Sequence, residues 1–279
     1  MNEMIRKKAK IREKTYLAPD IYRYSFLTDL CSGAEPGQFV MIYPVNGARL
    51  LGRPLCIADV SGEDNDSGRA DDPGHYFDIV FRVVGGGTEE ISGYNPGDEL
   101  YIEGPLGHGY PFDEKTIGGK NIVMLGGGLG APSLLFLAKK LMKAPSAFVS
   151  LTAVLGYRDR SMNHFLASDF GGTGIKTIIS TDDGSEGIRG NVIDALEESG
   201  IKADLIYACG PLPMLSAVKR YAKEAGATAY ISLEERMACG LGVCLGCVAK
   251  TTEKDAHSGV KNARVCTEGP VFCAETVDI

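Results

Sequence analysis

The sequence predicts a β plus α/β fold, in which an N-terminal antiparallel β-barrel is followed by a parallel α/β domain and a C-terminal cysteine-rich region. Short apolar runs separated by turn residues fill the chain as far as Glu114. From Asn121 onward, strand patterns alternate with helical patterns, and five of the eight cysteines fall at the C-terminal end. These three observations place the domains at residues 1–115, 116–228 and 229–279.

Length and charge exclude several classes of protein. The chain has 279 residues and a net charge of −7, which allows two or three domains and argues against nucleic acid as a partner. The basic N-terminal residues lead into no apolar segment, so they do not form a signal peptide. Residues 121–138 carry no charge, but glycines and Pro132 interrupt them, so we expect no membrane span. Eight cysteines suit a reducing compartment, and we expect a cytoplasmic protein.

The barrel strands are predicted from short apolar runs bounded by turn residues. They cover Ile21–Leu27, 38–44, 75–84 and 98–104. Residues 61–74 are acidic and polar, and they predict a mobile hairpin loop.

Three turns in this region have the composition of anion or ring sites. Arg53 follows Gly52 between two apolar segments, and an arginine held there can pair with a phosphate. Residues 85–88 read GGGT before a short helix, which suits an anion site but also a flexible hairpin turn. Residues 104–107, GPLG, predict a third turn that closes the barrel.

The middle domain begins with a buried strand at 121–125, the sequence GGGLGA at 126–131, and a helix to about Lys143. Further strands are predicted at 147–154, 175–180 and 205–208, with helices at 192–199 and 212–224. Strands that alternate with helices in this way indicate a parallel sheet.

The GGGLGA turn matches the pattern of a dinucleotide-binding turn after a strand. The acidic residue expected at the end of the second strand is missing, because that region reads Gly156-Tyr157-Arg158. The turn is therefore either a nucleotide-binding turn of another lineage or a packing turn. Cys209 follows the last strand, where its thiol either faces a bound ring or fills a buried position.

The C-terminal cysteines predict an electron-transfer centre. Cys239, Cys244 and Cys247 are spaced C-x4-C-x2-C, the plant-type ligand spacing of a two-iron, two-sulfur cluster. A structural zinc site is the alternative, although zinc sites usually pair two short CxxC spacings. Either Cys266 or Cys273 is close enough to complete the set. Gly269-Pro270 predicts a turn that carries Cys273 away along a new strand, which favours Cys266.

Together these segments resemble the ferredoxin–NAD(P) reductase superfamily, and within it the electron-transfer subunits of NAD-dependent bacterial dihydroorotate dehydrogenases. The resemblance covers nearly the whole chain. It is carried by the motifs RPLCI, IVFRVVGGGT, GPLG, MLGGGLGAPSL, TDDGS with GIRGNV, ACGPLPML, EERMACGLGVCLGC and RVCTEGPVF.

The resemblance implies three cofactors and their contacts, and it requires no catalytic acid or base. The flavin FAD would be lined by Arg53, Pro54, Leu55, Cys56, Val80, Phe81, Arg82, Gly87 and Thr88. NAD would lie over Gly126, Gly128 and Gly130, beside Cys209 and Gly210. The 2Fe–2S cluster would be held by Cys239, Cys244, Cys247 and Cys266. Cys56 departs from the family, which usually has a serine or threonine there, and a thiol is a weaker hydrogen-bond donor.

The implied function is electron transfer in pyrimidine (UMP) biosynthesis. A partner catalytic subunit oxidises dihydroorotate on its own FMN, and the two chains form a heterotetramer with two copies of each. Electrons then pass through the cluster and FAD to NAD+. One alternative is the small subunit of a ferredoxin–NADP oxidoreductase or sulfide dehydrogenase, whose cluster loops tend to contain an aspartate. Another is a non-catalytic electron-carrier or regulatory subunit that keeps the fold without nicotinamide turnover. The resemblance favours NAD over NADP, although Arg158 lies where an arginine can meet a 2′-phosphate.

Overall fold

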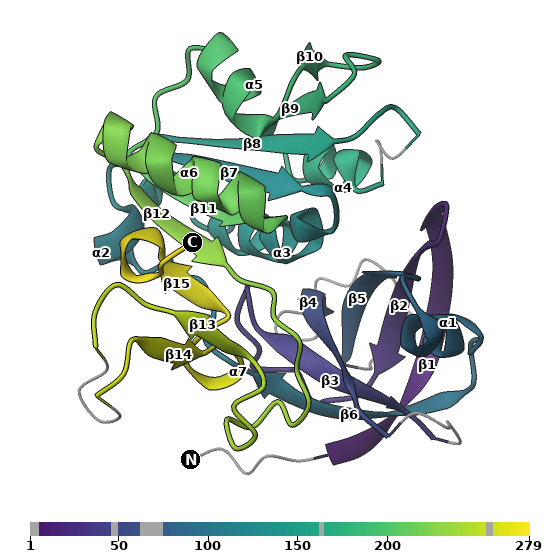
Figure 1. The fold of residues 1–279 in the computed structure, drawn as a ribbon. Coiled ribbons are helices and arrows are strands. Elements are labelled where there is room, and N and C mark those ends of the chain that lie inside the picture. The colour runs from purple at the N-terminus through teal and green to yellow at the C-terminus, as the bar shows by residue number, and fades with distance from the viewer. Residues whose placement is uncertain (1–5, 46–49, 62–74, 162–164, 255–258) are drawn as a thin grey trace.

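The computed structural model describes residues 6–45, 50–61, 75–161, 165–254 and 259–279. An α/β sheet, a β-barrel and a small C-terminal region pack against one another (Figure 1). The predicted fold class is confirmed. The hairpin loop predicted at 61–74 lies almost entirely outside the described residues.

The barrel is closed by six antiparallel strands in the order β1-β2-β5-β4-β3-β6. Its interior is filled by alternate residues along each strand, as in β6, where Leu100 and Ile102 are fully buried. Helix α1 (Gly86–Ser92) follows β5. The strands are β1 (Arg6–Ala18), β2 (Ile21–Leu27), β3 (Phe39–Pro44), β4 (Arg53–Ser61), β5 (Tyr76–Arg82) and β6 (Glu99–Leu106).

The turn predicted at residues 104–107 is wrong for most of its length. Gly104 to Leu106 continue strand β6, and Leu106 pairs with Phe39 of β3 after a register shift. Only Gly107 turns, with φ of +74°. The segment does close the barrel, but it does so by strand pairing, because β3 supplies a partner that composition alone does not reveal.

The second sheet has seven strands in the order β10-β9-β8-β7-β11-β12-β15, all parallel except β15. Its central strand, β7, is covered on both faces. Ile122 and Met124 pack with helix α3, whereas Val123 and Leu125 pack with helices α5 and α6. The elements are α2 (Glu114–Ile117), β7 (Asn121–Gly127), η1 (Gly128–Gly130), α3 (Ala131–Leu141), η2 (Pro145–Ala147), β8 (Ser150–Tyr157), α4 (Ala167–Gly172), β9 (Lys176–Thr181), β10 (Ile188–Arg189), α5 (Val192–Glu198), β11 (Leu205–Cys209), α6 (Leu212–Ala225) and β12 (Thr228–Ser232).

Several predicted boundaries in this domain move. The strand expected at 147–154 is β8, which starts at Ser150, because Pro145 begins a short 3₁₀ turn. Helix α3 ends at Leu141 rather than near Lys143. Elements α4, β10 and β12 were not predicted.

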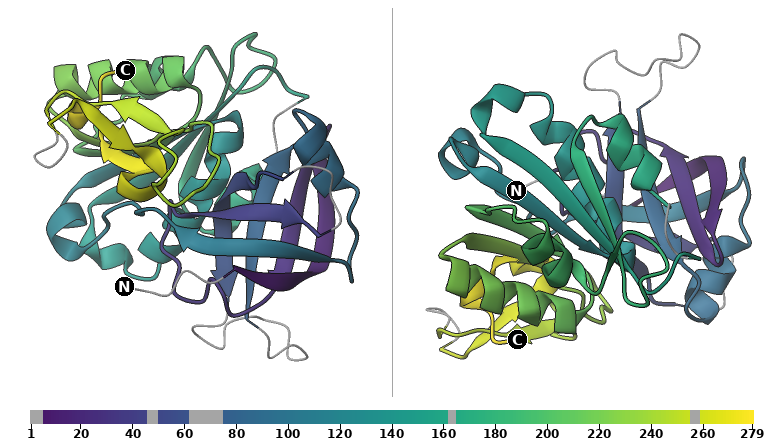
Figure 2. Two further views of the ribbon diagram at one scale, coloured as in Figure 1. Left: turned by 60° about the horizontal axis from the view of Figure 1, so that its bottom comes forward. Right: turned by 90° about the horizontal axis from the view of Figure 1, so that it is seen from above.

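The C-terminal region is built on a two-stranded hairpin and returns to the large sheet. Its elements are β13 (Val248–Lys250), β14 (Asn262–Arg264), α7 (Val265–Glu268), β15 (Val271–Cys273) and η3 (Ala274–Thr276). The strand predicted after Gly269-Pro270 is β15, which pairs antiparallel with β12. The sheet therefore spans the boundary drawn at residue 228, and the division into three domains stays a prediction. In Figure 2 this region (yellow) lies beside α6.

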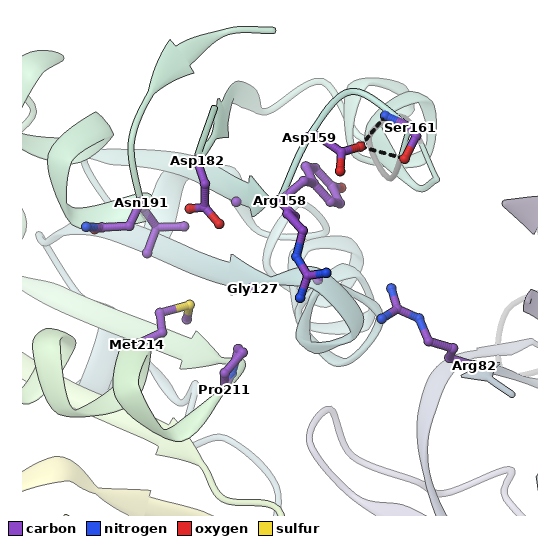
Figure 3. Close-up of a pocket in the computed structure, with 13 residues that line it drawn as sticks. Arg82, Gly127, Arg158, Asp159, Ser161, Asp182, Asn191, Pro211 and Met214 are labelled. Carbon is purple, nitrogen blue, oxygen red and sulfur yellow. Dashed lines mark hydrogen bonds between the residues drawn. The ribbon is translucent and has the colours of Figure 1, made fainter. Parts of the chain in front are cut away.

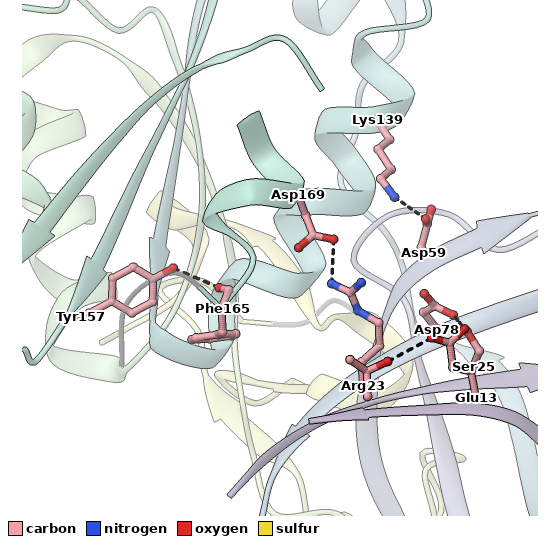
Figure 4. Close-up of polar contacts among 10 residues, drawn as sticks. Glu13, Arg23, Ser25, Asp59, Asp78, Lys139, Tyr157, Phe165 and Asp169 are labelled. Atoms are coloured by element: carbon pink, nitrogen blue, oxygen red, sulfur yellow. Dashed lines mark hydrogen bonds and ion pairs between the residues drawn. The ribbon is translucent and has the colours of Figure 1, made fainter. Parts of the chain in front are cut away.

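Helix α3 joins the sheet to the barrel. Phe136 projects from it into the barrel's apolar core and is 1% exposed. Two ion pairs bridge the same boundary (Figure 4): Arg23 on β2 contacts Asp169 on α4 at 2.8 Å, and Lys139 on α3 contacts Asp59 on β4. No helix in the described ranges is long and apolar enough to cross a membrane.

Replacing Phe136 with alanine is expected to destabilise both units together. Loss of a fully buried phenylalanine costs about 3–5 kcal/mol of unfolding free energy. Val149→Ala is the control, because this side chain is 67% exposed and its loss should cost less than about 0.5 kcal/mol. Urea unfolding followed by circular dichroism measures both. Equal losses in the two variants would contradict the assigned role of Phe136.

A second prediction concerns Asp78, which lies at this boundary. Burial raises its pKa to about 6, against a lowering by its hydrogen bond from Ser25. The folded state therefore holds this proton more tightly than the unfolded chain does. Stability should fall as pH rises from about 4 to about 6, and then level off.

Asp78→Asn removes this titration, because asparagine is neutral at every pH. The stability of the variant relative to the natural protein should rise by about 1 kcal/mol between pH 5 and pH 7.5. Urea midpoints at the two pH values measure it. A stability difference that does not change with pH would show that Asp78 titrates as in the unfolded chain.

Candidate functional site

The β13–β14 hairpin brings two of the predicted cluster cysteines together. Cys247 directly precedes β13, and Cys266 is the second residue of α7, the helix that follows β14. The register pairs Val248 with Arg264, and the N–H of Val265 donates to the Cys247 carbonyl at 3.0 Å. Cys247 and Cys266 are 2% and 1% exposed, so both thiols face the interior of this region.

Backbone N–H groups point at all four cysteine sulfurs. The Cys239 sulfur accepts from Leu241 at 3.3 Å and from Cys244 at 3.5 Å. The other three sulfurs accept one bond each: Gly242 donates to Cys266 at 3.2 Å, Gly246 to Cys244 at 3.4 Å and Cys266 to Cys247 at 3.4 Å. The positive φ of Gly242, +78°, suits the tight path that this arrangement requires. Such bonds stabilise thiolates, which are the form that binds iron.

The four cysteines approach one another as two pairs, Cys239 with Cys244 and Cys247 with Cys266. A two-iron cluster takes two thiolates on each iron, whereas a zinc ion takes four around one centre. The donor set therefore fits the two-iron cluster.

Cys239 and Cys266, one cysteine from each pair, differ in their pKa values. Desolvation raises the pKa of Cys239, but N–H donors from Leu241 and Cys244 outweigh it, and the pKa falls to about 6. Burial and the neighbouring Cys247 raise the pKa of Cys266 to about 11. Cys273 lies elsewhere, in β15 opposite Tyr230 of β12. The structure thus brings Cys266, and not Cys273, to the loop.

The loop packs directly on the barrel. A Cβ atom on Gly240 would lie 2.8 Å from Met41 and 3.2 Å from Leu106, so β3 and β6 touch the loop backbone. Its outer side is open, since Val243 and Leu245 are 80% and 62% exposed. The loop therefore lies between the barrel and the protein surface.

Two of the predicted flavin contacts meet at the start of α1. The guanidinium of Arg53 lies over Gly87, where a Cβ atom would come within 1.9 Å of Nε. Its Nη1 donates to the Leu51 carbonyl at 2.6 Å. The Thr88 hydroxyl, expected to face an anion, instead donates to the Gly85 carbonyl at 3.0 Å and caps the turn. The glycine backbone and Arg53 remain as the anion donors of this turn.

The other barrel residues lie on β4 and β5. The Phe81 ring is 1% exposed and packs edge-on against Tyr24 at 5.2 Å, so only its backbone can line a ligand. Val80 packs with the core beneath α3. Pro54 and Leu55 are half-buried on β4.

A pocket of about 460 Å³ opens between the barrel and the sheet. Arg82, at the end of β5, and Arg158, after β8, both point into it (Figure 3). Asp182, after β9, lies on its far side. The lining residues are Arg82, Gly127, Gly128, Gly156, Tyr157, Arg158, Asp159, Ser161, Asp182, Asn191, Val192, Pro211 and Met214.

The GGGLGA turn serves as both a packing turn and a pocket wall. A Cβ atom on Gly130 would lie 2.0 Å from the Cys209 carbonyl, so this glycine packs on the end of β11. Gly126 packs beside Leu155 in the same way. Gly128 lines the pocket and has open space on its Cβ side. Gly126 and Gly130 therefore serve packing, and the nucleotide-binding interpretation stays a prediction.

Acidic residues that the sequence prediction left unassigned lie in this pocket. The expected carboxylate is absent from the end of the second strand, but Asp182 follows the third, β9. Asp159 also lines the pocket, although hydrogen bonds from Ser161 engage its carboxylate and lower its pKa. The TDDGS motif, which carries part of the family resemblance, was the available signal for Asp182, but no role was assigned to this residue.

Two thiols lie on the seam between barrel and sheet. Burial raises the pKa of Cys209 to about 12, and the hydroxyls of Ser133, Ser232 and Tyr110 surround it. Burial raises the pKa of Cys56 well above its usual range, and the nearby Cys209 adds to the shift. Both are therefore neutral thiols near pH 7. Gly210 follows Cys209 and approaches Gly127 closely.

Comparison with known proteins places this arrangement in a family. Residues 234–278 match the family model described as the iron–sulfur cluster binding domain of dihydroorotate dehydrogenase B. The chain is also similar, at 28% identity and a TM-score of 0.79, to a chain in the structure of the NADH-dependent reduced ferredoxin-NADP oxidoreductase. That match covers 100% of this chain and 91% of the other.

Two curated relatives carry the same name, "Dihydroorotate dehydrogenase B (NAD(+)), electron transfer subunit". The relative from Geobacillus thermodenitrificans is 39% identical over 87% of this chain and 86% of its own length. The relative from Caldanaerobacter subterraneus subsp. tengcongensis is 36% identical over 97% of each chain. Because identity at this level extends over nearly the whole length, the chain belongs to the family of electron-transfer subunits of dihydroorotate dehydrogenase B.

Proposed function

We propose that the four cysteines of the two pairs hold a 2Fe–2S cluster and that the pocket between barrel and sheet holds NAD. The observation that carries this proposal is the set of backbone N–H groups directed at the sulfurs of Cys239, Cys244, Cys247 and Cys266. Family membership confirms the predicted function, an electron-transfer subunit that uses FAD, 2Fe–2S and NAD.

FAD is assigned to the barrel face that meets this pocket. Arg53 and the glycine turn before α1 supply cationic and N–H donors for its phosphates. The strand ends at Pro54–Cys56 and Val80–Arg82 supply backbone for its ring, and Cys56 and Cys209 lie at the seam where the barrel meets the sheet. A flavin links one-electron traffic to two-electron hydride transfer, and the protein positions NAD beside it.

The family name implies a catalytic partner subunit. We propose that this partner carries FMN, oxidises dihydroorotate to orotate, and forms a heterotetramer of two copies of each chain in the cytoplasm. The exposed loop around Cys244 supports this proposal, since it places the cluster position next to the surface.

The proposed function is tested with the two chains co-expressed and purified under argon. Dihydroorotate should reduce NAD+ in the complex, and one FAD and two iron atoms should be found in each copy of this chain. Zinc in place of iron, or no NADH formation by a fully loaded complex, would overturn the proposal.

A second function is favoured by the structural similarity to the NADH-dependent reduced ferredoxin-NADP oxidoreductase. An all-cysteine loop favours the first function, since the ferredoxin-linked chains tend to carry an aspartate in the loop. Reduction of this chain by ferredoxin and NADPH, but not by dihydroorotate with its partner, would support the second function.

Cys266 and Cys273 give a matched pair of variants. Cys266→Ser should lose or strongly shift the visible absorption of the cluster, because it removes one of the four proposed ligands. Cys273→Ala should keep that absorption, since Cys273 lies in β15 opposite Tyr230. The absorbance and the iron content of the two purified variants distinguish these outcomes. The reverse pattern would assign the ligand to Cys273.

The pocket charges predict a preference for NAD over NADP. The Asp182 carboxylate can accept a hydrogen bond from a ribose hydroxyl and repels a 2′-phosphate, whereas Arg158 attracts one. Asp182→Asn should therefore improve kcat/KM for NADPH relative to NADH by about tenfold, for the loss of about 1.4 kcal/mol of repulsion.

Dye reduction by each nicotinamide measures this ratio, and Asp183→Asn is the neighbouring control, because Asp183 does not line the pocket. An unchanged ratio in Asp182→Asn, or a natural preference for NADPH, would contradict the assignment of Asp182.

A further inference from the structure

One buried hydroxyl in the cluster region has no hydrogen-bond partner. Within the described part of the chain, three buried side-chain oxygens lack a partner: those of Ser61, Ser180 and Thr267. Only Thr267 lies beside a proposed ligand, as the residue after Cys266 in α7. A buried hydroxyl without a partner costs free energy, so its presence calls for an acceptor that the polypeptide does not provide.

Thr267 packs against the cysteine loop at the point where the loop meets Cys266. A Cβ atom on Gly242 would lie 2.9 Å from the Thr267 methyl carbon and 3.0 Å from its hydroxyl. The same glycine donates its N–H to the Cys266 sulfur at 3.2 Å. The Thr267 hydroxyl and the Cys266 sulfur therefore contact one loop residue, and no side chain at position 242 separates them.

Among the described residues, no neighbouring protein group accepts a hydrogen bond from the Thr267 hydroxyl, so this hydroxyl remains available as a donor. The Gly242 carbonyl already accepts from Arg264 at 3.4 Å, and Arg264 also pairs with Glu268 at 2.8 Å. The acceptors that a loaded site would add are the sulfur atoms of the cluster. Each proposed ligand sulfur already accepts a hydrogen bond from a backbone N–H. Because a hydroxyl can also donate to sulfur, the Thr267 hydroxyl would add one more hydrogen bond of this kind.

We propose that the Thr267 hydroxyl donates a hydrogen bond to a sulfur of the bound 2Fe–2S cluster and raises its reduction potential. This inference rests on the proposed ligand set. Reduction adds one negative charge to the cluster, and a donor to sulfur stabilises that charge. Thr267 would not bind iron itself. It would act indirectly, because its hydrogen bond to a cluster sulfur changes the reduction potential.

The test is an EPR-monitored redox titration of the loaded protein with its partner subunit. Thr267→Val keeps the shape of the side chain and removes the donor. Its one-electron reduction equilibrium should weaken by about tenfold, which is about 59 mV toward more negative potential. Thr267→Ser keeps a hydroxyl and should restore a potential close to that of the natural protein.

Ser180→Ala is the matched control. It removes another partnerless buried hydroxyl, in β9 of the large sheet, and should leave the cluster potential unchanged. If Thr267→Val assembles no cluster, Thr267→Ala serves as the second variant lacking the donor. A natural potential in a loaded variant without the hydroxyl, or an equal shift in Ser180→Ala, would overturn the inference.

The outcome for the proposed function is separate. A natural protein that binds zinc or shows no EPR signal after reduction would overturn the cluster assignment itself. A natural protein with a two-iron signal whose potential is unaffected by Thr267→Val leaves the cluster assignment standing and removes only the role of Thr267.

Discussion

Four cysteine sulfurs lie in one small region, and backbone N–H groups that donate to them offset the negative charge that they would carry as thiolates. The cost of gathering thiolates falls when each accepts hydrogen bonds, and every sulfur here does so. Three other features of this region help to hold the sulfurs and their donors in place. Glycines let the loop turn, and the β13–β14 hairpin fixes Cys247 beside Cys266. The close contact with β3 and β6 holds the loop against the barrel.

The loop, the barrel and the sheet share one apolar core. Met41 and Leu106 from the barrel pack in the same core as Val265 and Cys266 from the cluster region, and as Leu215 and Val218 of α6. Helix α3 adds a second connection through Phe136, and two ion pairs reinforce it. Electron transfer between sites needs their separation to stay constant. A shared core provides that constancy better than exposed ion pairs, which contribute little alone.

Much of the fold could be predicted from the sequence, because periodicity reports which faces are buried. Short apolar runs between turn residues located β2, and the change of period at Asn121 located the parallel sheet. The pairing of strands was harder to predict from the sequence. Gly104 looks like a turn residue, yet it lies in β6, because β3 offers its backbone there. Turn residues report local preference only, whereas a strand partner comes from a distant part of the chain.

In the candidate site, too, some residues could be predicted from the sequence and others could not. The cysteine spacing located the cluster loop, and the turn at Gly269-Pro270 singled out Cys266. Asp182 was missed because the fingerprint expects its carboxylate one strand earlier. The hydroxyl of Thr88 donates to the Gly85 carbonyl within its own turn, and its expected contact with FAD stays a prediction. Thr267 was not noticed either, since a missing partner is a property of packing and not of spacing.

The cysteines show how strongly surroundings decide the chemistry of one side chain. N–H donors lower the pKa of Cys239 to about 6, so it is mostly a thiolate near pH 7. Cys209 lies in a dry seam, where desolvation raises its pKa to about 12 and keeps it a thiol. Thiolates react readily with electrophiles and oxidants, whereas buried neutral thiols react slowly. Burial thus keeps Cys56 and Cys209 protonated where the barrel meets the sheet, and neither thiol acts as a nucleophile near pH 7.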